Sequence, residues 1–149
     1  MVHLGYNHDF SAMGQAAQTD RQVIEAIGDV LRGTDRPLLI ASGTLGLAPG
    51  GVGTETDRPD PAVHPRVVNA QVALDLADQG VRSLVARFAP TVHGPGDHGF
   101  VAVLVAIARE KGVSAYLGDG TNRWSAVHRL DAAHLVRLAL DTAPAGSVL

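Results

Sequence analysis

The chain has no cysteine, few aromatic residues and no cluster of basic residues. Without cysteine it can form no disulfide, no thiolate nucleophile and no thiolate metal site. Because aromatic residues make up only 4% of the chain, the core has to be built mainly from alanine, valine and leucine. The net charge of -3 and the mixed signs give no electrostatic footprint for nucleic acid or for an anionic membrane surface. We therefore expect a small-molecule substrate and no nucleic-acid partner.

Long hydrophobic runs and targeting signals are also missing. No stretch approaches the ~18 consecutive apolar residues of a membrane-spanning helix. The first ten residues, MVHLGYNHDF, have neither the basic segment nor the long apolar segment of a secretion signal. Together with the lack of cysteine, this predicts a cytoplasmic protein with no membrane partner.

The most informative stretch of the sequence is VRSLVARFAPTVHGPGD, residues 81–97. Its first eight residues are mostly apolar and too few for a helix, which predicts a strand buried on both faces of a sheet. Ala89 and Pro90 end the strand, and a polar, glycine-rich segment follows. Ligands of parallel sheets bind just past the carboxyl ends of the strands, so this segment is a candidate site. An ordinary turn between a strand and a helix fits the same residues.

Apolar segments of strand length alternate with amphipathic segments of helical length. We expect strands at residues 2–6, 37–41, 81–88, 114–117 and 124–128, another beginning at Ser147, and helices at residues 10–31, 66–78, 100–111 and 131–142. The alternation indicates crossover connections and a mainly parallel sheet flanked by helices, so the predicted fold class is α/β. Residues 47–65 lack periodicity and are rich in proline and glycine, which predicts a long surface loop. At 149 residues the chain has the length of one domain.

The helix ends and helix faces can be predicted in more detail. Asp9 or Ser11 is expected to cap the first helix and Asp131 the last, with Gly33 ending the first. Helical spacing predicts three core-facing sets: Val23, Ile24, Ile27, Val30 and Leu31; Val68, Val72 and Leu76; Val101, Leu104, Val105 and Ala108.

The glycines do not form the usual phosphate-binding turn between a first strand and a first helix, where dinucleotide-binding folds carry G-x-G-x-x-G. Residues 50–53, GGVG, lie in the proline-bearing loop, so we interpret them as a flexible loop.

Four motifs in the same order resemble short-chain dehydrogenase/reductases of the extended, epimerase/dehydratase type. The strand ending in Ser42-Gly43-Thr44 resembles the strand that carries the catalytic serine of that family. Residues 87–97, RFAPTVHGPGD, resemble its R-x-x-x-V-Y-G-P-G segment, with His93 in place of the tyrosine. Residues 118–120, GDG, followed by Trp124, Val127, His128 and Asp131, resemble the family's G-D-G stretch, which leads through a short strand to an aspartate-capped helix. Residues 3–5, HLG, resemble the H-L-A that ends the family's fourth strand.

The resemblance implies a partial Rossmann-like fold, corresponding to the C-terminal portion of such a protein and lacking its N-terminal glycine-rich motif. Residues 1–149 would form one truncated NAD(P)-binding domain, with residues 97–130 contributing to a small substrate lobe. The implied cofactor is NAD or NADP, without its main pyrophosphate-binding turn. The implied cofactor contacts are Leu4, Gly5, Tyr6, Ser42, Pro90 and Val92. The implied substrate contacts are His93, Asp97, Phe100, Arg123, Trp124 and His128, and Ser42 and Thr44 would polarise a substrate oxygen.

The catalytic tyrosine and lysine of that family are missing at the matching positions, where Arg66 and Ala70 stand. A tyrosine made acidic by a nearby lysine can pass a proton at working pH, whereas an arginine stays protonated. Arg66 could bind an anionic group instead. This departure matches an atypical branch of the family and argues against ordinary dehydrogenase chemistry.

Alternatives to an NAD(P)-dependent oxidoreductase or epimerase therefore stay open. The chain could be a non-catalytic NAD(P)- or small-molecule-binding module, or an inactive remnant that associates with itself through an unpaired sheet edge. Seven histidines are present, but no H-E-x-x-H motif occurs, so no metal site is predicted. The residues around Ser42 do not form the G-x-S-x-G turn of a hydrolase.

Overall fold

The computed structural model describes residues 1–9, 11–62 and 65–149. Its main sheet has four parallel strands in the order β1-β2-β3-β6, and a second sheet pairs β4 with β5. The strands are β1 (Val2–His3), β2 (Pro37–Gly43), β3 (Arg82–Phe88), β4 (Thr91–His93), β5 (Ala126–His128) and β6 (Ser147–Val148). The helices are α1 (Met13–Leu31), α2 (Pro65–Asp75), the 3-10 helix η1 (Ala77–Gln79), α3 (Phe100–Lys111) and α4 (Arg129–Thr142). The predicted α/β class with a mainly parallel sheet is confirmed.

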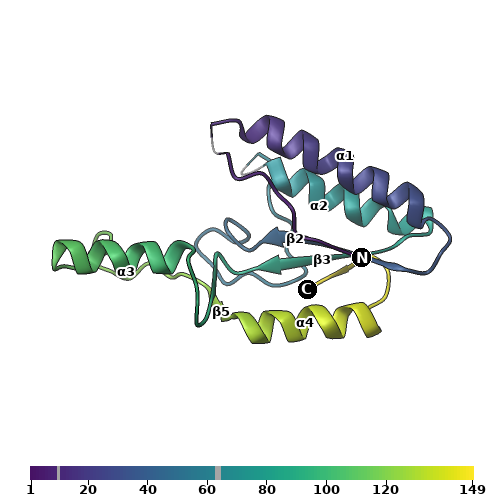
Figure 1. Ribbon diagram of the computed structural model, residues 1–149. Helices are drawn as coiled ribbons and strands as arrows, with labels where there is room; N and C mark the ends of the chain where they lie inside the picture. The colour runs from purple at the N-terminus through teal and green to yellow at the C-terminus, as the bar shows by residue number, and fades with distance from the viewer. Residues whose placement is uncertain (10, 63–64) are drawn as a thin grey trace.

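The central pair β2 and β3 is covered by helices on both faces (Figure 1). Alternate residues of a strand point to opposite faces, so Leu38 and Ile40 pack with α1 and α2 while Leu39 packs with α4. On β3, Val85 belongs to the first core and Leu84 to the second. The expectation of a strand buried on both faces is confirmed for β3.

A buried polar cluster joins β1 to the two helices above the sheet. The Nε2 atom of His3 lies 2.8 Å from Oδ1 of Asp20, and Nδ2 of Asn69 donates to Oδ2 of Asp20 at 2.7 Å and to the carbonyl of Ala17 at 2.9 Å. Asp20 and Asn69 are 8% and 3% exposed. These contacts fix the short strand β1, and therefore the chain leaving it, against α1 and α2.

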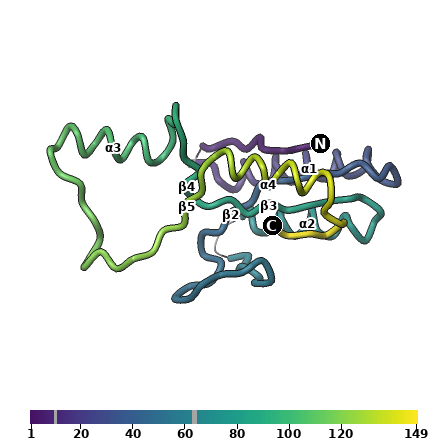
Figure 2. Tube along the Cα trace, turned by 90° about the horizontal axis from the view of Figure 1, so that it is seen from below, coloured from purple at the N-terminus to yellow at the C-terminus, as the bar shows by residue number. Residues whose placement is uncertain are grey.

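Helix α3 and the chain that returns from it form an arm that extends away from the main sheet, with the second sheet at its base (Figures 1 and 2). The chain leaves β3, forms β4, runs out along α3 and returns through residues 112–125 to β5. Both views show α3 apart from the layers formed by the sheet, α1, α2 and α4. Among the described residues, none of the helices combines the length and hydropathy that crossing a bilayer requires.

Several predicted boundaries are wrong in detail. The described residues 114–117 form no strand, because they find no neighbouring strand to pair with along the outer part of the arm. The first helix begins at Met13 after Ala12, and Asp9 accepts hydrogen bonds from Ser11 instead of capping it. The first residue of the predicted helix 10–31 lies outside the described residues.

The last helix begins at Arg129, two residues earlier than predicted, and its cap is not Asp131. The Nδ1 atom of His128 accepts the backbone N–H of Leu130 at 3.3 Å, and Asp131 lies in the first turn. The glycine stop of the first helix is confirmed, since Gly33 follows it with φ of 71°.

The predicted helix faces are correct only in part. On α1, Ile24 and Leu31 are buried as expected, whereas Val30 is 77% exposed. On α2 the core face contains Asn69, Ala70 and Ala73, and Val68 is exposed. None of the described residues of α3 is buried, so the expected core face of that helix is wrong for this chain.

The predicted loop at residues 47–65 is irregular over its described part, residues 47–62, and α2 begins at Pro65. Arg87, near the end of β3, holds this loop by donating to the carbonyl oxygens of Asp57 at 3.0 Å and Glu55 at 3.4 Å. Partial burial lowers the pKa of Arg87, and the neighbouring Arg58 lowers it further.

Candidate functional site

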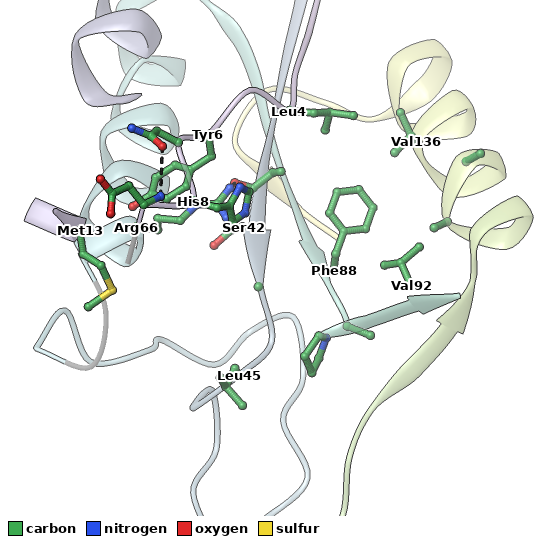
Figure 3. Close-up of a pocket in the computed structure, with 18 residues that line it drawn as sticks. Leu4, Tyr6, His8, Met13, Ser42, Leu45, Arg66, Phe88, Val92 and Val136 are labelled. Carbon is green, nitrogen blue, oxygen red and sulfur yellow. Dashed lines mark hydrogen bonds between the residues drawn. The ribbon is translucent and has the colours of Figure 1, made fainter. Parts of the chain in front are cut away.

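A cavity of about 830 Å³ opens where β1, β2 and β3 end. Its walls are mostly apolar and come from the chain after β1, the ends of β2 and β3, and one side of α4 (Figure 3). This is the edge at which parallel sheets bind ligands. The strand exits and α4 place side chains that are far apart in sequence, such as Leu4, Phe88 and Val136, around one space.

Arg66 supplies a fixed positive charge on one wall of the cavity. Its guanidinium carbon lies 4.2 Å from the centre of the Tyr6 ring, and Nη2 donates to the carbonyl of Ala41 at 3.1 Å. A guanidinium over an aromatic face is attracted by the ring and held in place. Because arginine keeps its proton at any working pH, this group can bind an anion or polarise an oxygen but cannot transfer a proton.

The chain after β1 contributes polar residues, among them Tyr6 and Asp9, to the cavity wall. The Tyr6 hydroxyl is buried and has no hydrogen-bond partner among the described residues. Buried hydroxyl groups are nearly always satisfied, so a water molecule or a ligand atom is expected beside it. Hydrogen bonds from the Ser11 hydroxyl and backbone N–H hold the pKa of Asp9 below its usual value, so this carboxylate at the cavity wall stays ionised.

The two residues predicted to polarise a substrate lie in different cavities. Ser42 lines the large cavity beside Tyr6 and Arg66. Thr44 lines a second cavity of about 450 Å³, and its Oγ1 lies 3.1 Å from Oγ of Ser125. The structure therefore brings Ser42 and Arg66 together and separates them from Thr44.

Most of the predicted cofactor contacts gather around the large cavity. Leu4, Tyr6, Ser42, Pro90 and Val92 all line it, whereas Gly5 is not part of its wall. Phe88, Ala132 and Val136 were not predicted for this site. The sequence could have pointed to Phe88, because it is the last residue of the buried strand. It could also have pointed to Ala132 and Val136 as neighbours, because residues four apart lie on one side of a helix.

Five of the six predicted substrate contacts line two smaller cavities, and Phe100 lines neither. Trp124 and Arg123 line the second cavity, and the Trp124 ring stacks on Phe100 with a centre-to-centre distance of 5.5 Å. The indole N–H of Trp124 donates to Oγ1 of Thr91 at 2.9 Å, which ties the returning chain to β4.

A third cavity of about 460 Å³ is lined by His93, Asp97 and His128. The two imidazole rings meet edge to face at 5.6 Å. No group of three histidine, aspartate or glutamate side chains that could hold a metal ion occurs within residues 1–9, 11–62 and 65–149.

The spacing G-x-G-x-x-G does occur in the chain, at Gly94, Gly96 and Gly99 before α3. The structure does not give these glycines the geometry of a phosphate cradle. A Cβ at Gly94 would lie 3.0 Å from the Arg129 side chain, so a larger residue here would crowd that arginine. The carboxylate of Asp97 accepts the backbone N–H of Gly99 at 2.7 Å, which places a negative group where a phosphate would bind.

Comparison with known proteins adds relatives and a fold. No protein-family model matches the chain. The chain is 50% identical over 150 residues to an uncharacterized protein of Schizosaccharomyces pombe and 44% identical over 149 residues to one of Saccharomyces cerevisiae. Each match covers 99% of this chain and 50% of the relative. The chain therefore spans about half the length of the curated relatives it matches.

Among solved structures, the chain is similar to dTDP-glucose 4,6-dehydratase from Bacillus anthracis in complex with NAD, with a TM-score of 0.73 and 18% identity over 99% of this chain and 49% of that one. It is also similar to MoeE5 in complex with UDP-glucose and NAD, with a TM-score of 0.73 and 20% identity over 99% of this chain and 54% of that one. At such identities the likeness concerns the fold, and it shows that this chain has a Rossmann-like α/β architecture with a mainly parallel sheet.

Proposed function

We propose that the cavity at the ends of β1, β2 and β3 is part of an NAD(P)-linked site that acts on a small carbonyl or hydroxyl substrate, such as the sugar of a nucleotide sugar. The observation that carries this proposal is the position of the cavity. It lies past the carboxyl ends of parallel strands, with a serine and a fixed cation in a mostly apolar wall. The structural neighbours with this fold were solved as complexes with NAD, which supports the choice of cofactor.

The residues fit one half of the cofactor better than the other. Leu4, Pro90 and Val92 offer the apolar surface that a nicotinamide ring needs, and Tyr6 adds an aromatic edge with an unsatisfied hydroxyl. For the pyrophosphate half this cavity offers the Arg66 guanidinium but, among the described residues, no cradle of backbone N–H groups, since the nearby Asp9 is a carboxylate and Asp97 accepts the Gly99 N–H before α3. When bound, NAD(P) would supply hydride acceptance and donation.

The chain's own residues would orient and polarise the substrate. Ser42 can donate a hydrogen bond from its hydroxyl to a substrate oxygen, and Arg66 can stabilise negative charge that develops on that oxygen. Arg66 cannot replace a tyrosine as the proton donor, because its guanidinium does not give up its proton. We therefore expect cofactor binding with weak turnover or none.

The absence of the family's catalytic tyrosine and lysine favours a second candidate function, a non-catalytic module that binds NAD(P) or another small molecule. Arg66 and Ala70 occupy the positions at which the resemblance would place the tyrosine and lysine. The contact of Arg66 with Tyr6 and Ala41 holds the guanidinium in a fixed place, as a binding residue requires.

Titration calorimetry and thermal shift with NAD(H) and NADP(H) test the proposal. Micromolar binding that raises the melting temperature by mass action supports it, and Arg66→Leu should weaken that binding about tenfold or more. Arg36→Leu is the matched control, because Arg36 is exposed and does not line the cavity. No binding at millimolar cofactor would refute the NAD(P) site.

A turnover assay then separates the two candidate functions. The chain is incubated with the bound cofactor and with dTDP-glucose or UDP-glucose, and the redox state of the nicotinamide is followed by absorbance. If hydride transfer is observed and the Ser42→Ala variant shows less of it, the chain is an oxidoreductase. Tight binding without transfer identifies a binding module.

A further inference from the structure

Helix α3 has the composition of a buried helix but is exposed. Its residues 100–108 carry no charge, and the charged residues are confined to the last turn, at residues 109–111. The large apolar side chains are exposed by 50% at Phe100, 52% at Val103, 48% at Leu104, 42% at Val105 and 47% at Ile107. Helices that are apolar on most of their circumference are normally buried in a core.

The exposed apolar surface of α3 is not confined to one side. Successive residues of a helix are rotated by about 100°, so Val103 and Val105 lie about 160° apart around the axis. Both are exposed. A single helix packed against α3 would cover one of these valines and leave the other in water, so the surface requires a broader partner such as a groove.

The accessible surface area of the chain exceeds that of a typical folded monomer of the same mass. The accessible surface is 9568 Å² for a mass of 15.5 kDa. Folded monomers of this mass expose about 7,200 Å². The excess of about 2,400 Å² is larger than the ~800 Å² per partner of a standard interface and matches about half of the ~5,000 Å² that a large permanent interface buries on both partners together.

The relatives indicate what covers this surface. Both fungal proteins match nearly the whole chain but only half of their own length, so each has about as many residues again outside the match. The structural neighbours show the same proportion, with 49% and 54% of their chains matched. A polypeptide of that length can form a groove around a helix, whereas a second α3 cannot cover both valines.

We propose that α3 is the docking surface for a polypeptide equivalent to the unmatched half of these relatives, which receives the helix in an uncharged, apolar groove. This proposal does not depend on the NAD(P) site. It predicts that α3 is exposed to solvent in the isolated chain and buried in the complex.

The test uses the 149-residue chain and the unmatched half of the Schizosaccharomyces pombe protein, expressed together. Light scattering after size exclusion should show a one-to-one complex. Hydrogen exchange of residues 100–108 should slow at least about tenfold relative to the chain alone, because exposed helices open easily and buried ones do not. Val103→Glu should weaken the complex by more than about tenfold, since a buried unpaired carboxylate is costly.

The control is Val30→Glu, an equally simple change at a 77% exposed helical valine of α1, which should leave the affinity within about twofold. A chimera in which this chain replaces the matching half of the relative provides a second arm that needs no separately folded partner. Slow exchange at residues 100–108 in the chimera supports the proposal. Fast exchange there, or a homodimer of the isolated chain that already protects α3, overturns it.

Discussion

The buried amide of Asn69 provides the sharpest test of the packing between β1, α1 and α2. Asn69→Ala removes the amide that donates a hydrogen bond to Asp20 Oδ2 at 2.7 Å. The Asp20 carboxylate is only 8% exposed, so this oxygen loses a partner that water cannot easily replace. A hydrogen bond to a charged group contributes about 1.5–3 kcal/mol, and an unsatisfied buried oxygen adds to the loss. After a gain of about 0.5 kcal/mol in helix propensity, we expect the free energy of unfolding to fall by about 2–3 kcal/mol.

For a chain of this size the expected loss lowers the melting temperature by roughly 4–12 °C. Urea unfolding followed by circular dichroism measures it. The matched control is Gln71→Ala on the same helix, where the amide donates to Asp75 Oδ1 at 2.8 Å in an exposed position and should change stability by less than about 0.5 kcal/mol. A double-mutant cycle with Asp20→Ala should show that the two losses are not additive. Equal stabilities of the Asn69 and Gln71 variants would refute the reasoning.

Three further predictions concern packing, pH and the arm. Gly28→Ala should lower the unfolding free energy by about 1–3 kcal/mol in urea melts despite its better helix propensity, because the new Cβ would lie 2.7 Å from a Leu76 methyl group; a stabilised variant would contradict this. Hydrogen bonds from the Thr54 backbone and hydroxyl lower the pKa of Asp57. Because the folded-state pKa is depressed, this support of the loop is present above the unfolded pKa and is lost as pH falls through the folded pKa. An NMR titration of the Asp57 carboxyl should show the pKa rising in Thr54→Ala, and an unchanged pKa would contradict the assignment. Trp124→Phe removes the indole donor to β4 and should accelerate hydrogen exchange in β4 and β5, with unchanged exchange as the contrary result.

The candidate site could be predicted only in part from the sequence. The exits of the strands were predicted to form the site, and Leu4, Ser42, Pro90 and Val92 do line one cavity. Thr44 was expected to act with Ser42 only because the resemblance to the epimerase/dehydratase family implied it. The strand β2 ends at Gly43, so Thr44 lies beyond the strand and lines another cavity.

The sequence by itself determined the α/β class of this protein. Alternating strands and helices leave few arrangements other than a parallel sheet covered on both faces. The glycine stops and the long loop also followed from local conformational preferences, which need no distant contact.

Only the tertiary structure decided which residues meet and which helix lacks a cover. The contact of Arg66 with Tyr6 and the cluster of Asp20 with Asn69 join segments that are far apart in the chain, and no spacing rule relates them. The apolar spacing of α3 predicted a buried face, and none of its described residues is buried. Whether a helix is buried depends on a partner surface, and the described residues of this chain do not provide one for α3.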